Sequence, residues 1–220
     1  MKITKLSFTT CILIVLTVIS LIGIYFTRGD ESLKSILFPV FLALFVSVIF
    51  YVSTVAIPER QRRNRVKNGL RKQYLAFKKR CISLMLMASR SQNYPNKENL
   101  LNHEEFTRYF KCRVNQDQIR WDLVTTSIDD QDYVFDGLLA ELEFLIREVE
   151  YARSKVCIED EEVESFMIRL SEITYLMKMS QPHSDDHKYF SRNLWQMFSR
   201  YDPIDSQTSV DLIEVMIENI

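Results

Sequence analysis

Glycine and proline are scarce in this sequence, with four glycines and five prolines among 220 residues. These are too few turn-forming residues for an all-β fold or for an α/β fold rich in glycine loops. The four cysteines (Cys11, Cys81, Cys112 and Cys157) are widely spaced and form no CxxC pair, so neither a zinc site nor a disulfide framework is indicated. The sequence therefore predicts an all-α protein in a reducing compartment.

The motifs of common enzymes are also missing, because no GxSxG, GxxxxGK[ST], GxGxxG or HExxH occurs. The best cluster of titratable side chains is His183, Asp185, Asp186 and His187, in which the two histidines are spaced to share a helix face as metal ligands. Ser184 and the two acids also suit the start of a helix, and this capping interpretation is the favoured one. We expect neither an enzyme nor a bound metal or cofactor.

Charge is distributed unevenly along the chain. Residues 81–220 hold 26 Asp and Glu against 14 Lys and Arg, a net charge of −12, while nearly all long apolar runs precede residue 58. The chain is therefore divided into an apolar N-terminal segment, a basic junction and an acidic remainder.

Two apolar runs are long enough to cross a bilayer. Residues 6–26 contain 21 uncharged residues and residues 36–57 contain 22, close to the roughly 20 that a membrane-spanning helix needs. Because the loop between them is short, the runs predict an antiparallel transmembrane hairpin over residues 1–58. A cleaved signal peptide is the alternative for the first run, although no small-x-small cleavage site follows it.

A basic collar follows the second run. Ten cations and no acid occur within the 21 residues from Arg60 to Arg80, so the collar is expected to lack compensating charge. Positive residues beside a span stay on the cytoplasmic side, which predicts a multi-pass protein with both termini in the cytoplasm. The collar comprises Arg60, Arg62, Arg63, Arg65, Lys67, Arg71, Lys72, Lys78, Lys79 and Arg80.

The collar has two open interpretations. It can bind the anionic headgroups of the lipid bilayer, at about 1 kcal/mol for each residue near the surface. It can also bind nucleic acid, because neutralisation of phosphates by Lys and Arg gives affinity that does not depend on sequence. The lipid interpretation is favoured.

Small and hydroxylated residues recur at helical spacing within both runs. Such residues let membrane helices approach closely, so packing of the hairpin is the simpler interpretation. The alternative is that they line a hydrated path in a homo-oligomer, since two helices alone cannot enclose a pore. The residues are Thr10, Thr17 and Ser20 in the first run and Ala43, Ser47 and Thr54 in the second.

Beyond the collar, apolar residues recur in steps of three and four. One stripe from Leu70 to Ala88 predicts a juxtamembrane helix over residues 59–90, and a second from Leu138 to Val156 predicts a long helix capped by Asp129 or Asp130. Further stripes follow, with five or six amphipathic helices in all. They predict a cytoplasmic helical bundle over residues 91–220.

Two short spans, an arginine-rich junction that begins PERQRRNR, and an acidic helical domain together resemble the two-transmembrane effectors of bacterial retron anti-phage systems. The resemblance covers the layout of the whole chain and includes no diagnostic motif. It implies an abortive-infection toxin in the bacterial inner membrane, silenced by a reverse transcriptase bound to its RNA-linked DNA. The alternative function is a membrane-anchored scaffold or adaptor without toxic activity.

Overall fold

The computed structural model describes residues 5–26, 31–156, 161–179, 185–200 and 211–219, and its regular elements are helices. No β-strand forms in these ranges, which confirms the predicted all-α class. The chain divides into two units, Met1–Arg63 and Asn64–Ile220. The elements are α1 (Lys5–Phe26), α2 (Glu31–Tyr51), the π-helix η1 (Val52–Ala56), α3 (Ile57–Ala88), the 3-10 helix η2 (Lys97–Leu101), α4 (His103–Phe110), α5 (Arg120–Asp130), α6 (Asp132–Lys155), α7 (Glu161–Met179), α8 (Asp185–Ser199) and α9 (Leu212–Asn219).

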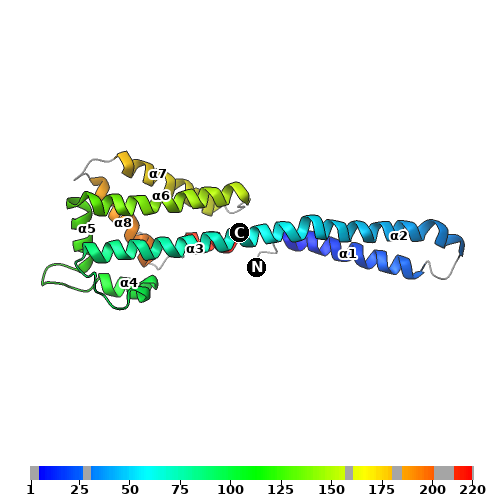
Figure 1. Ribbon diagram of the computed structural model, residues 1–220, viewed down its shortest axis with the longest axis horizontal. Helices are drawn as coiled ribbons and strands as arrows, with labels where there is room; N and C mark the ends of the chain where they lie inside the picture. The colour runs from blue at the N-terminus through cyan, green and yellow to red at the C-terminus, as the bar shows by residue number, and fades with distance from the viewer. Residues whose placement is uncertain (1–4, 27–30, 157–160, 180–184, 201–210, 220) are drawn as a thin grey trace. The chain divides into compact units, whose positions relative to one another are not determined.

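In the first unit, α1 packs alongside α2 (Figure 1). Gly23 makes the close approach possible, because a Cβ atom at this position would lie 2.5 Å from the ring of Phe41. Phe41, Phe45 and Val48 recur at helical spacing and are less exposed than their neighbours on α2. The remaining described side chains of both helices are mostly apolar and exposed.

One helix in the described part of the chain, Leu37–Ala88, is long and apolar enough to cross a membrane, judged by length and composition. Its most apolar 18-residue window is not buried within the protein. In α1 the described side chains form a shorter apolar stretch, Leu13–Gly23. An uncovered apolar surface of this size is unusual for a protein that faces water on all sides.

In the second unit, the stripe on α3 packs into a single hydrophobic core. Leu70, Tyr74, Phe77, Cys81 and Ala88 are buried as their spacing predicts. The core also takes the α6 stripe from Leu138 to Ala152, together with buried residues of α4, α5, α8 and α9. These elements are brought together because each has one apolar face that only the others can cover.

The prediction that Asp129 or Asp130 caps the long helix is wrong. Both residues belong to the last turn of α5, an element that the apolar spacing does not indicate, and α6 begins after Gln131. α5 forms because the carboxylate of Asp122 accepts a 2.8 Å hydrogen bond from the N–H of Ile119 and because Val124 and Ile128 are buried.

Candidate functional site

The basic collar is largely paired with carboxylates, so the expectation of uncompensated charge is wrong. At least seven of its ten cations lie within 4.0 Å of a described Asp or Glu oxygen: Arg62, Arg63, Lys67, Arg71, Lys78, Lys79 and Arg80. Most of these acids lie far from the collar in the sequence. The absence of acids within residues 60–80 therefore did not reveal them.

The two ends of the collar differ in their partners. Arg62 and Arg63 pair with Glu59 on the same helix, at 3.8 and 3.2 Å, in exposed contacts that contribute little to stability. From Lys67 onward the carboxylates come from α6, α9 and the η2 segment, as in the 2.9 Å contact between Lys79 and Glu98. The second half of the collar is therefore part of the folded second unit.

A buried polar cluster joins α3 to the residue that precedes α9. The carboxylate of Asp211 accepts hydrogen bonds from the hydroxyl of Tyr74 at 2.6 Å and from Nζ of Lys78 at 2.8 Å. All three side chains are buried, and Lys78 also lies over the ring of Tyr74. Burial, together with the charge of Asp211 and its hydrogen bond, raises the pKa of Tyr74 well above its ordinary value.

Asp211 also starts α9. Tyr74 and Lys78 donate to Oδ2 of Asp211, and Oδ1 accepts hydrogen bonds from the N–H groups of Ile213 and Glu214, both at 3.1 Å. Asp211 is therefore the N-cap residue of α9. At the other end of the helix, Glu218 pairs with Lys67 and Arg71, and these cations hold the pKa of its carboxyl below the ordinary value.

In α1, the structure describes the side chains of two of the three small-residue candidates, Thr17 and Ser20. Ser20 is fully buried and Thr17 is half-buried, and each hydroxyl donates to the carbonyl four residues earlier in α1, at 2.7 Å. The hydroxyls thus bond within their own helix rather than across to α2. The side chain of Thr10 lies outside the described residues.

In α2 and η1, Ala43, Ser47 and Thr54 are exposed. Ser47 donates to the carbonyl of Ala43 at 2.7 Å and Thr54 to that of Phe50 at 2.6 Å, so their hydroxyls are satisfied within the helix. The contact with α1 uses the aromatic face of α2 instead. The structure therefore leaves this small-residue face uncovered within one copy of the chain.

The possible metal site is only partly described, because His183 and the side chains of Asp185 and Asp186 lie outside the described residues. His187 is buried against the ring of Phe135, with 4.2 Å between ring centroids, and its Nδ1 lies 3.4 Å from Asp129. No cluster of three metal-ligating side chains occurs among the described residues. Here His187 acts as a core aromatic residue.

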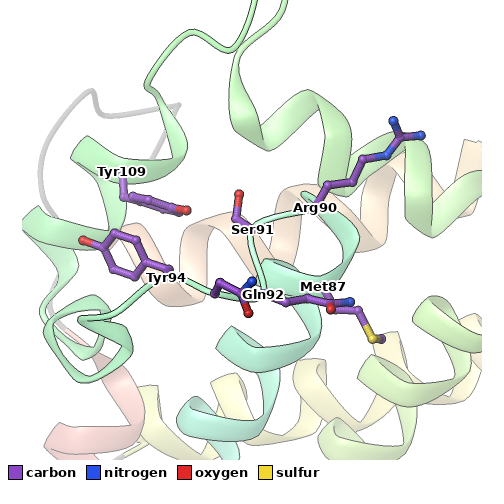
Figure 2. Close-up of a pocket in the computed structure, with 7 residues that line it drawn as sticks. Met87, Arg90, Ser91, Gln92, Tyr94 and Tyr109 are labelled. Carbon is purple, nitrogen blue, oxygen red and sulfur yellow. The ribbon is translucent and has the colours of Figure 1, made fainter.

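A shallow cavity of about 380 Å³ lies beyond the C-terminal end of α3. Figure 2 shows the hydroxyl of Tyr109 directed toward Ser91, while the side chain of Arg90 points away from the two tyrosines. The described residues that line it include no carboxylate, imidazole or thiol, so they provide no acid, base or nucleophile pair. Its lining residues are Met87, Arg90, Ser91, Gln92, Asn93, Tyr94 and Tyr109.

Comparisons of the chain with protein-family models, with curated proteins and with solved structures found no match.

Proposed function

We propose that this chain is a membrane-acting effector of an anti-phage abortive-infection system. The apolar helix Leu37–Ala88 carries the proposal, because its uncovered apolar window requires a nonpolar solvent that lipid supplies. With α1 as a second span, the chain is multi-pass in the inner membrane and both termini lie in the cytoplasm.

The damage to the membrane is assigned to several copies acting together. Ala43, Ser47 and Thr54 are exposed on the side of the helix away from the face that contacts α1, so their face is available for contact with other copies. Small residues favour such helix contacts in lipid. A homo-oligomer of hairpins can then line a hydrated path across the bilayer, which two helices alone cannot enclose.

Silencing is assigned to a reverse transcriptase bound to its RNA-linked DNA, and this part of the proposal rests on the resemblance in layout. The exposed cations of the collar offer a surface for phosphate contacts in such a complex. Co-purification of the chain with a reverse transcriptase encoded beside it tests the partnership directly.

Induced expression without partners tests the effector. We expect the membrane potential to collapse within minutes of induction, as reported by a potential-sensitive dye. Ser47→Leu, which fills the uncovered small-residue face, should abolish the collapse. Val46→Leu adds bulk to an exposed apolar neighbour and should retain it. Both variants must reach the membrane fraction in equal amounts.

A membrane-anchored adaptor is the competing function. It would leave the membrane potential unchanged on induction even though the chain accumulates in the membrane. That result would contradict the effector proposal, and the hairpin would then serve only as a membrane anchor.

A further inference from the structure

The long apolar helix changes its hydrogen-bond pattern just before the collar. In η1 the N–H of Ile57 donates to the carbonyl of Val52, five residues earlier, instead of the usual four. The hydroxyls of Ser53 and Thr54 both donate to the carbonyl of Phe50, at 3.0 and 2.6 Å. This turn therefore accommodates one residue more than an α-helical turn, and every later side chain is rotated from the position that a continuous α-helix would give it.

The extra residue decides which part of the collar continues the face of Ser47. In a regular α-helix, residue 58 lies three turns beyond Ser47 on the same side, and residue 61 lies about one turn further. Both are uncharged, being Pro58 and Gln61. The π-helical turn moves this face along by one residue, so that it continues through Glu59 and Arg62.

Glu59 is shared between two arginines. Its carboxylate lies 3.8 Å from Arg62 and 3.2 Å from Arg63, and the three side chains are between 40% and 50% exposed. Because one acid opposes two cations, the group has a net positive charge in each copy of the chain. Arg60 is exposed and adds a further positive charge beside the group.

Inside the span, the polar groups on this face are hydroxyls, because residues 36–57 contain no charged residue. Ser47 and Thr54 donate their protons to carbonyls of their own helix, so their oxygens offer only lone pairs to an ion outside the helix. These oxygens favour cations, whereas the arginines favour anions. The arginines outweigh the hydroxyls in this comparison, because they carry full charges and the hydroxyl oxygens carry only partial ones.

We propose that the hydrated path of the assembled effector selects small anions, and that the group formed by Glu59, Arg62 and Arg63 sets this preference. The inference rests on the proposed homo-oligomer, in which each copy contributes one such group to the cytoplasmic mouth. A ring of arginine side chains raises the local concentration of anions there. The sequence between the two spans adds no opposing preference, because residues 27–35 contain two cations and two acids.

Anion selectivity accounts for the expected loss of membrane potential. The interior of a cell is electrically negative, so anions are driven outward, and their efflux carries positive current inward. A cytoplasmic mouth that concentrates anions therefore speeds depolarisation.

Conductance measurements on the reconstituted protein test the selectivity. The purified full-length chain is inserted into a planar bilayer of neutral lipid, and the reversal potential is measured across a tenfold gradient of KCl. This potential gives the ratio of chloride to potassium permeability for either orientation of the chain in the bilayer. We expect chloride to be more permeant by roughly fivefold or more.

Three variants change the charge of the group in known directions. Glu59→Gln removes the acid and should raise the permeability ratio by about twofold or more. Arg62→Gln combined with Arg63→Gln leaves the carboxylate of Glu59 unopposed within the group and should abolish the preference for chloride. Arg62→Lys combined with Arg63→Lys keeps both charges, so this control should retain the ratio of the unmodified chain.

The outcomes separate this inference from the proposed function. A preference for potassium in the unmodified chain, or equal ratios in Glu59→Gln and the double glutamine variant, overturns the anion selectivity and leaves the conducting path intact. Absence of any conductance from the inserted chain contradicts the homo-oligomeric path itself, and the proposed function then fails together with the inference.

Discussion

At the scale of single residues, Tyr74 links the stability of the second unit to alkaline pH. Burial raises its pKa well above the ordinary value of 10.0. The unfolded chain therefore loses this proton first, so the stability that the neutral hydroxyl contributes is complete below about pH 10 and falls as the pH rises above it. We expect the melting temperature, followed by circular dichroism, to decline as the pH rises above 10.

Tyr74→Phe isolates this effect. The variant should be destabilised by about 1 kcal/mol at neutral pH, because the buried carboxylate of Asp211 loses one hydrogen bond, and its alkaline decline should be shallower. Tyr133→Phe, at a tyrosine that is 58% exposed, should keep the decline of the unmodified chain. Identical pH profiles for all three proteins would contradict the assignment.

The buried polar cluster itself was beyond prediction from the sequence. Lys78 was identified only as one of ten collar cations, because Asp211 lies 133 residues later in the chain. Periodicity indicates which face of a helix is buried, but it does not indicate which acid will meet a cation on that face. Such pairings depend on tertiary contacts between helices.

At the scale of elements, the packing of the helices is tested by two glycines, one in a crowded position and one in an open position. Gly23 lies against the ring of Phe41, whereas a Cβ atom at Gly69 on α3 would have no neighbour within 4 Å. Gly23→Ala should force α1 away from α2 and weaken their contact. Gly69→Ala should stabilise α3 by about 1 kcal/mol, since alanine is the better helix former.

Thermal unfolding in detergent measures the gain at Gly69. Crosslinking between cysteines placed in α1 and α2 measures the loss at Gly23. If the rate of crosslinking between α1 and α2 is unchanged in Gly23→Ala, the packing of these two helices does not require glycine at this position.

Helical stripes were predicted well where they were long. The stripes on α3 and α6 are buried as expected because each supplies one continuous apolar face of four or more turns. α5 was missed because it is short, with only Val124, Ser127 and Ile128 buried along its length. The acids at its end were then taken for the cap of the next helix. A short helix has few buried residues, so its sequence shows little apolar periodicity from which it could be predicted.

At the scale of the whole molecule, the collar combines two tasks along one helix. Arg60 and its near neighbours lie within a few residues of the apolar run, whereas Lys67, Lys78 and Arg80 are engaged with acids of the second unit. The sequence grouped these cations into one collar by their proximity along the chain. It did not separate the part that can retain the chain in the cytoplasm from the part that stabilises the fold.

The proposed orientation in the membrane depends on the first part of the collar, from Arg60 to Arg65. A fluorescent reporter that matures only in the cytoplasm, fused after Ile220, should be bright. Replacement of Arg60, Arg62, Arg63 and Arg65 by glutamine, together with Asp30→Lys and Glu31→Lys between the two apolar runs, should reverse the balance of positive charge and extinguish most of the signal.

A matched control removes the same number of arginines far from the spans. Glutamine at the exposed positions Arg108, Arg113, Arg147 and Arg192 should leave the reporter bright, because distant charges do not direct insertion. A dark reporter on the unmodified chain would contradict the cytoplasmic assignment of the second unit. Equal dimming of both sets of variants would instead indicate that loss of net charge impairs folding, and the collar would then have no specific role in topology.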